Sequence, residues 1–329
     1  MALGTLLARR VRRAGAAWLA CLATGAAGCG GEVVNLGSSP LAGGGSAGSA
    51  GNAPGGTAAH IWELPSEPVF APDVGFLLAN PTLTAKEDEL YYSEQQRGGS
   101  PEPNPVLIKH AQLSAAQWGN FTKLTLGDAG MPDASSPAIS LDGTELWLGM
   151  NATGSTDIFR SVLQGGAWST PAPVSELNSA FDDVPRQPGL HGSVMPLSSK
   201  RLGATPALYQ IYFSTRDSAD APWSEPNKDL LGAVDSSAFQ SADGFLTDNG
   251  LELYFSSTRD GDSDLYVARR ASTDASFGEP EALADLNDPN GTATATQERM
   301  PWLSPKGDQL YFASDRTGQY ALYVANKAR

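Results

Sequence analysis

Cysteine and charged side chains are both scarce in this 329-residue chain. The two cysteines, Cys21 and Cys29, lie near the N-terminus, so the chain after residue 60 has none and a disulfide framework is excluded. Charged residues make up only 18% of the chain, whereas glycine (36 residues) and proline (23 residues) are plentiful. This composition is typical of many short strands joined by turns rather than of long charged helices.

Basic residues are scarcer than acidic residues. Residues 1–59 hold four of the 22 basic residues and one of the 36 acidic residues, which leaves 18 basic and 35 acidic side chains and a net charge of −17. A surface this acidic repels phosphate backbones, which excludes a nucleic-acid groove as the main function. Keeping the protein soluble is the simpler role of such a charge.

Signatures of common catalytic and metal sites are absent as well. The sequence has no G-x-S-x-G, H-E-x-x-H or P-loop motif, and His60, His110 and His191 lack metal-ligand spacing. The D-x-D-x-D run at 260–264 offers oxygen atoms that suit Ca²⁺, but position 12 of that loop is Ala271 rather than Glu. We therefore expect no metal site and no cofactor.

The N-terminal segment has the pattern of an export signal. Four arginines precede an apolar stretch, 14–27, which is too short and too interrupted by glycine for a good membrane span. It ends in AAGC (26–29), which resembles a bacterial lipobox, although Ala26 stands where that motif prefers Leu. The resemblance implies that residues 1–29 are a lipoprotein signal peptide and that Cys29 is lipidated; an ordinary signal-peptidase site is the alternative.

Residues 30–60 are rich in glycine, serine and alanine. Such a segment buries too little apolar surface to offset its ordering entropy, so it is predicted to be a flexible tether. Gly30 rather than Asp follows Cys29, which by the same resemblance implies sorting to the outer membrane. We expect an exported protein that is lipid-anchored in the outer membrane, with residues 61–329 as its one folded domain.

A short strand pattern recurs five times after residue 60. The apolar residue in its second position recurs at steps of 56, 48, 59 and 57 residues, which is typical of one propeller blade per repeat. Each copy is preceded by an apolar strand and a turn, and it is followed by a third strand. In four of the copies an aromatic-led segment comes after the third strand. The copies are ELYYSEQQR (89–97), ELWLGMNAT (145–153), SVMPLSSKR (193–201), ELYFSSTRD (252–260) and QLYFASDRT (309–317).

The two ends of the folded region complement each other. The fifth copy stops at Arg329 before its fourth strand, while a matching segment led by Trp62 opens the domain. An N-terminal strand that completes the last blade closes a ring and removes a free sheet edge. The sequence thus predicts an all-β, five-bladed β-propeller of four-stranded antiparallel blades closed in this way. In the divergent third copy it predicts 187–191 as the innermost strand.

The best copies, 243–270 and 300–327, resemble the WD40-like repeat of TolB-type β-propellers. The resemblance covers nearly all of residues 62–329 and is specific for fold but weak for function. It implies a non-catalytic interaction module of the bacterial cell envelope whose partner is an envelope protein or a cell-wall component. We expect the protein to be a monomer.

The residues that open the innermost strands are the candidate binding residues. Connectors between blades cross one face of a propeller, and their last residues ring the mouth of the central channel, where loops converge and ligands bind. The alternative is that these polar groups only hold water in the channel. The predicted ligand-binding residues are Asn80, Ser136, Arg186, Gln187, Asp243, Glu298 and Arg299.

A glycan hydrolase is the alternative function. Five-bladed propellers include glycoside hydrolases that use carboxylates around the channel, and four acidic residues could supply the acid and the base. Two carboxylates within about 5–10 Å of each other across the mouth would favour this function. The four residues are Asp182, Asp183, Asp243 and Glu298.

An arginine ends the second strand of four copies. Repetition at one position favours a structural, charge-assisted bond within or between blades over a role in ligand binding. These residues are Arg97, Arg201, Arg259 and Arg316.

Overall fold

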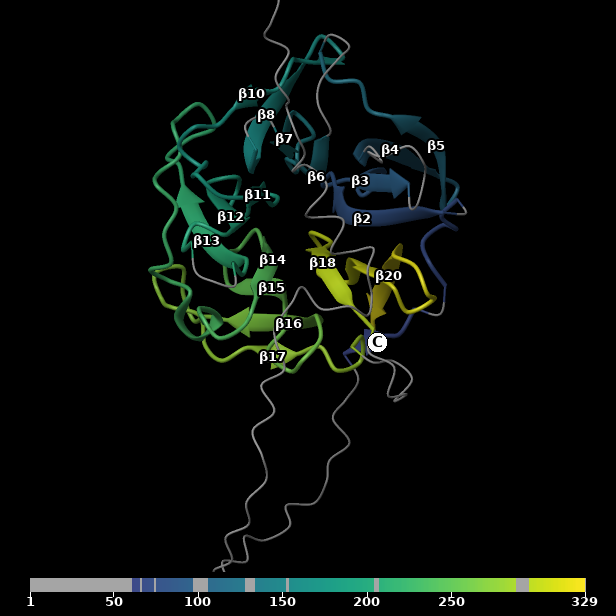
Figure 1. Cartoon of the computed structure of the whole chain (residues 1–329). Helices are drawn as coiled ribbons and strands as arrows, with labels where there is room; N and C mark the ends of the chain where they lie inside the picture. The colour runs from purple at the N-terminus through teal and green to yellow at the C-terminus, as the bar shows by residue number, and fades with distance from the viewer. Residues whose placement is uncertain are drawn as a thin grey trace, which may run out of the picture.

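The computed structural model describes residues 61–65, 67–73, 75–96, 106–127, 134–151, 154–203, 207–287 and 296–328. Within them the chain forms five antiparallel sheets around a common axis (Figure 1), and the one helical element is a 3₁₀ turn, Gly232–Val234. The predicted all-β, five-bladed propeller is therefore confirmed. The same residues include no helix that is long and apolar enough to cross a membrane.

Each blade runs from an inner strand at the axis to an outer strand at the periphery. Blade 1 contains β2 (Phe76–Leu83), β3 (Glu89–Gln96), β4 (Val106–Ser114) and β5 (Gln117–Lys123). Blade 2 contains β6 (Ala134–Ile139), β7 (Glu145–Asn151), β8 (Thr156–Gln164) and the short β9 (Ala167–Trp168) and β10 (Ala172–Pro173). Blade 3 contains β11 (Asp183–Pro185), β12 (Val194–Ser199) and β13 (Gln210–Thr215). Blade 4 contains β14 (Ser241–Leu246), β15 (Glu252–Ser257), β16 (Asp264–Arg269) and β17 (Glu281–Ala282). Blade 5 contains β18 (Glu298–Leu303), β19 (Gln309–Ser314), β20 (Ala321–Lys327) and β1 (Trp62–Glu63).

The ring closes as the sequence predicts. Strand β1 pairs antiparallel with β20, with Trp62 opposite Lys327. The carboxylate of Asp285, at the end of blade 4, accepts hydrogen bonds from the amides of Ile61 (2.8 Å) and Trp62 (3.2 Å). Trp62 is only 4% exposed, so the N-terminal strand adds a core side chain at the seam.

Blade 3 is the irregular one. Its inner strand is Asp183–Pro185, so the prediction of 187–191 was wrong: that segment bends into the turn that the Gly189–Val194 bridge closes. In the described part of the chain its outer position is held by a single bridge between Phe213 and Asn227 rather than by a strand. The inner strand of blade 3 departs from the repeat because the turn that follows it lacks the Asp-Gly or Asn-Gly pair found in the neighbouring blades.

The inner strands of the other four blades each carry a β-bulge. A non-glycine residue with a left-handed backbone lies at each bulge, a conformation that costs energy and re-aims the side chain. These residues are Asn80 (φ 54°), Ser136 (φ 51°), Asp243 (φ 60°) and Met300 (φ 60°). Three of them are predicted site residues, so the bulges set the orientation of those side chains.

Aromatic side chains of the outer segments join neighbouring blades. Trp168 of blade 2 packs edge-on against Tyr91 of blade 1, and Trp223 of blade 3 packs edge-on against Trp147 of blade 2, both with ring centroids 6.4 Å apart. Burial of large rings between blades supplies much of the stability of such an array.

In two blades the repeated arginine joins the blade to the connector that precedes it. In blade 5, Arg316 donates to the carbonyl oxygen of Leu286 (2.9 Å) and forms an ion pair with Glu298 (3.4 Å). Arg201 makes the same two contacts in blade 3, with Leu177 and Asp183 (2.7 and 2.8 Å). Blade 4 lacks the carboxylate, because Ser241 stands where the other two blades have it. Arg259 still makes a charge-assisted bond within its blade, from Nε to Ser257 Oγ (3.3 Å), and Arg201 and Arg316 make the equivalent bond. Arg97 lies outside the described residues.

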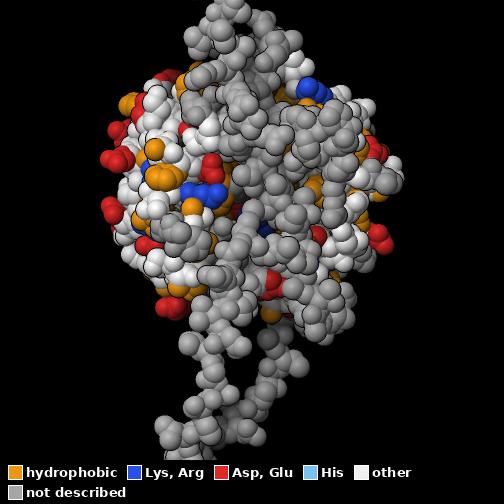
Figure 2. All heavy atoms as spheres, in the orientation of Figure 1, with side chains coloured by type: hydrophobic (Ala, Val, Ile, Leu, Met, Phe, Trp, Pro, Cys, Tyr) orange, Lys and Arg blue, Asp and Glu red, His pale blue; other side chains and the backbone are white. Residues whose placement is uncertain are grey.

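Figure 2 shows acidic side chains distributed around the periphery of the disc, as the excess of acidic residues predicts.

Candidate functional site

All seven predicted binding residues are buried in the centre of the propeller. They come from the inner strands of blades 1, 2, 4 and 5 and from the segment that follows β11 in blade 3. Their exposed fractions are 0% for Asn80, Ser136, Asp243 and Glu298, 4% for Gln187, 6% for Arg186 and 7% for Arg299.

Two arginines and their acceptors fill the axis. Arg186 donates through Nη1 to Oδ1 of Asn80 (3.0 Å), which joins blade 3 to blade 1. Arg299 forms an ion pair with Asp243 (3.4 Å), whose Oδ2 also accepts a hydrogen bond from Ser256 (2.7 Å). Burial lowers the pKa of Arg186, Asp243 opposes that effect and Arg299 adds to it. A guanidinium titrates so high that Arg186 remains charged at neutral pH.

Gln187 connects four blades through one amide. Its Nε2 donates to the carbonyl oxygens of Leu83 (3.0 Å) and Ile139, and its Oε1 accepts from the indole of Trp302 (2.8 Å). The backbone amide of Ser136 is likewise used between blades. The seven residues therefore act as inter-blade contacts, and their role in binding a ligand stays a prediction.

Glu298 lies at the start of β18 and is protonated more easily than an ordinary glutamate. Its carboxylate accepts hydrogen bonds from Ser314 (2.7 Å) and Thr296 (3.3 Å) and lies 3.4 Å from Nη2 of Arg316. Burial raises the pKa of Glu298 to about 7, and this effect outweighs the attraction of Arg316.

The other carboxylates that could serve a hydrolase are also held by protein groups. Asp182 accepts hydrogen bonds from the amide of Thr156 (3.0 Å), from Lys200 (2.9 Å) and from Tyr209 (3.1 Å). Burial alone would raise the pKa of Asp182, but these bonds outweigh it and lower the pKa. Asp183 is fully buried against Arg201.

Three adjoining hollows, with volumes of about 450, 450 and 440 Å³, open on the surface near blades 2 and 3. The first is lined by the inner hairpin turns of blades 2 to 5 at one end of the axis. The second and third lie along the boundary of blades 2 and 3, and we call these two together the 2–3 groove. The first shares Leu141, Pro188, His191 and Asp248 with the second. The second shares Arg160, Val162, Arg216, Ala219 and Asp220 with the third, which extends outward to Trp223.

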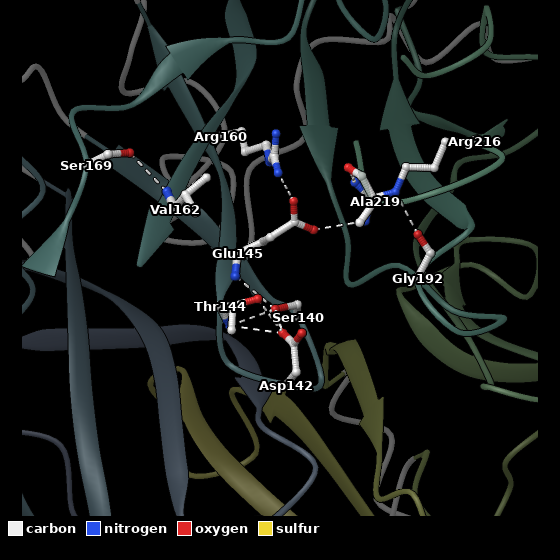
Figure 3. Close-up of polar contacts among 10 residues, drawn as sticks. All are labelled: Ser140, Asp142, Thr144, Glu145, Arg160, Val162, Ser169, Gly192, Arg216 and Ala219. Carbon is white, nitrogen blue, oxygen red and sulfur yellow. Dashed lines mark hydrogen bonds and ion pairs between the residues drawn. The ribbon is translucent and has the colours of Figure 1, made fainter. Parts of the chain in front are cut away.

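A buried glutamate lies at the middle of the 2–3 groove. Figure 3 shows the carboxylate of Glu145 between Arg160 of its own blade and Arg216 of blade 3. Arg216 bonds to Glu145 (2.9 Å) and to the carbonyl oxygens of Gly192 (2.9 Å) and Ala219 (2.8 Å). The side chain of Arg216 is 5% exposed and that of Arg160 is 34% exposed, so only Arg160 faces solvent.

The turn before β7 fixes the position of Glu145. Ser140 Oγ accepts hydrogen bonds from the amides of Thr144 (3.1 Å) and Glu145 (2.9 Å), and Asp142 accepts from Thr144 (Figure 3). Burial would raise the pKa of Asp142, but hydrogen bonds from Ser140 and Thr144 lower it, so this turn carries a negative charge at the groove. Gly143 supplies the left-handed residue of the turn (φ 74°).

The turn of blade 3 forms the opposite side of the groove. Asp248 accepts hydrogen bonds from the backbone amide of His191 (2.6 Å) and contacts its Nδ1 (2.8 Å). Leu190 and His191 both have a left-handed backbone (φ 49° and 55°). Two consecutive strained residues persist only where neighbours hold them, and here Asp248 does so.

The sequence did not point to the 2–3 groove. A weak signal was present, since the second strand begins with glutamate in three copies, at Glu89, Glu145 and Glu252. Among the described contacts of these three, only Glu145 meets an arginine from the next blade, and that contact joins residues 71 positions apart. In the residues that the structure describes, no group of three or more His, Cys, Asp or Glu side chains is arranged to hold a metal ion.

Comparisons with known proteins show the fold. No family model and no curated protein matches the chain. Among solved structures, a glycoside hydrolase has 10% identity and a TM-score of 0.56, over 82% of this chain and 92% of that one. A TolB from Acinetobacter baumannii has 17% identity and a TM-score of 0.46, over 79% of this chain and 56% of that one. A protein described as a TolB from Agrobacterium tumefaciens has 16% identity and a TM-score of 0.46, over 76% of this chain and 80% of that one. The five blades agree with the resemblance of the repeats to TolB-type propellers. A shared fold does not show that this chain has the activity of any of these structures.

Proposed function

We propose that this protein is a non-catalytic binding module of the bacterial envelope, tethered through Cys29 to the outer membrane, and that it takes an envelope protein or a cell-wall component in the 2–3 groove. Residues 1–29, Cys29 and the tether at 30–60 lie outside the described residues, so tethering rests on the sequence alone. The groove is favoured over the seven predicted channel residues because its two hollows are lined by the one-third exposed Arg160, whereas those seven side chains are at most 7% exposed.

One observation carries the non-catalytic assignment. Of the four carboxylates suited to a hydrolase, Asp183, Asp243 and Glu298 are fully buried and bonded to protein groups, and Asp182 is held by three donors. None of the four lines any of the three hollows. A glycosidic acid and base must both face the substrate, so this arrangement supports binding without hydrolysis.

Sedimentation with purified peptidoglycan sacculi and, in parallel, with outer-membrane vesicles tests the proposal, with release of reducing ends measured in the same tubes. We expect the protein to sediment saturably with one of the two and to release no reducing ends. Release that is lost in Glu298→Gln or Asp243→Asn, in a variant that remains folded under the assay conditions, would instead establish the hydrolase.

Cell fractionation tests the tether. We expect the full chain in the outer-membrane fraction and Cys29→Ala in the soluble periplasmic fraction. An unchanged distribution of Cys29→Ala would contradict lipidation at this residue.

A further inference from the structure

We propose that the middle of the 2–3 groove binds the free C-terminal carboxylate of a peptide, with Arg160 as the residue that receives it. This inference rests on the proposed binding function and names the chemistry of its ligand. It starts from the charges around Glu145.

The buried part of the groove holds one carboxylate and two guanidinium groups. Arg216 is saturated, because its Nε, Nη1 and Nη2 each bond to protein oxygens. Arg160 has one such bond, from Nη2 to Glu145, and its side chain is one-third exposed. One positive charge therefore remains at Arg160, at the place where the second and third hollows meet.

Arg160 is also held ready for a ligand. Its backbone lies in the middle of β8, paired with Trp147 on one side and Ala172 on the other. Glu145 fixes one end of its guanidinium and is itself fixed by the Ser140 turn. A guanidinium oriented in this way offers its remaining donors as a planar fork, which matches a carboxylate better than a point charge does.

Two donors beside the groove have no acceptor. Arg160 Nε and the indole nitrogen of Trp147 are buried and have no hydrogen-bond partner among the described residues. Trp147 lines the second hollow. A ligand oxygen that entered there would give such a donor an acceptor, whereas a ligand amine would not.

The rim of the groove has the opposite charge. Asp142, Asp220 and Asp248 line the same hollow as Arg160. Three carboxylates around a single cation repel phosphate polymers and any ligand with several negative groups, but they attract a basic side chain beside a lone carboxylate. The matching ligand is a peptide that ends in a free carboxylate and has lysine or arginine just before its last residue.

A peptide fits better than a sugar chain for a second reason. Sugar rings bind against exposed aromatic faces, and the two tryptophans of the groove, Trp147 and Trp223, are 0% and 6% exposed. The second and third hollows instead adjoin along the boundary of two blades and share Arg160, which suits an extended backbone whose end lies at this residue.

Fluorescence anisotropy with the full-length protein tests the inference. The probe is fluorescein-Gly-Ser-Gly-Lys-Ala, prepared with a free C-terminus and as the C-terminal amide. We expect the free acid to bind about tenfold more tightly than the amide, the worth of one charge-assisted hydrogen bond. Arg160→Gln should remove this preference. Lys109→Gln, which breaks an ion pair with Glu94 on blade 1, is the matched control and should keep it.

Three results would overturn the inference: equal affinity for acid and amide, a preference that survives in Arg160→Gln, or no binding of either probe. Displacement by an oligoglucuronate more readily than by the unlabelled peptide would assign the site to an acidic glycan instead. If sedimentation with sacculi or vesicles persists while the acid and amide bind equally, only this inference fails. If neither sedimentation nor peptide binding is seen, the proposed function fails with it.

Discussion

Arginine and carboxylate side chains meet both at the axis and in the 2–3 groove, but they differ in their exposure to solvent. At the axis, Arg299 meets Asp243 with both side chains at most 9% exposed. In the groove, Glu145 meets two arginines, one of which is 34% exposed and lines two hollows. The comparison teaches that an arginine–carboxylate contact holds blades together where packing excludes solvent, and becomes available to a ligand where an irregular blade leaves space.

The largest expected effect comes from breaking the axial contact. Asp243→Asn removes the carboxylate that forms an ion pair with Arg299 and offsets the burial of Arg186, which leaves two buried cations with less compensation. We expect a loss of about 3–5 kcal/mol in the free energy of unfolding, measured by urea denaturation. Asp220→Asn, at an exposed groove position, is the control and should change it by less than about 0.5 kcal/mol.

The ring seam should respond to a similar degree, because it too is closed to solvent. Trp62→Ala deletes a large side chain that is 4% exposed where β1 completes blade 5. We expect urea denaturation to show a loss of about 3–5 kcal/mol. A change below about 0.5 kcal/mol would mean that the N-terminal strand does not hold the ring closed.

The matched change in the groove should cost less. Glu145→Gln keeps the shape of the side chain but removes its charge between Arg160 and Arg216. Since solvent reaches Arg160, we expect a loss of about 1–3 kcal/mol. A loss equal to that of Asp243→Asn would erase the distinction between the two regions.

Those two regions also differ in how far the sequence anticipates them. Repeat spacing and the Trp62 segment suffice for five blades and their closure, because both depend on local strand patterns. The same patterns place Asn80, Ser136 and Asp243 at the start of inner strands. They do not reveal that these side chains are buried, since that depends on contacts among all five blades. The sequence does not predict the groove, because the groove depends on long-range contacts such as that of Glu145 with Arg216. It also lies beside a blade whose inner strand departs from the repeat.

A pH dependence gives the smallest expected effect. Burial raises the pKa of Glu298 to about 7, whereas an ordinary glutamate has a pKa of 4.5. Between these values the folded protein binds more protons than the unfolded chain, so this residue makes the free energy of unfolding fall as pH rises from 5 to 7. We expect a shallower fall in Glu298→Gln, measured by urea denaturation across that range. Identical pH profiles of the two proteins would show that Glu298 titrates normally.

The central claim is that the 2–3 groove, and not the axis, is the working surface. Ala219→Trp tests it most directly, because Ala219 is exposed and lines both the second and the third hollow. The measurement is the sedimentation isotherm with the envelope fraction that binds the unmodified protein, and Ala282→Trp on the exposed outer strand of blade 4 is the control. The account predicts that Ala219→Trp loses binding while Ala282→Trp keeps it, with both proteins unfolding like the original. Full binding by Ala219→Trp would contradict the account and return attention to the faces around the axis.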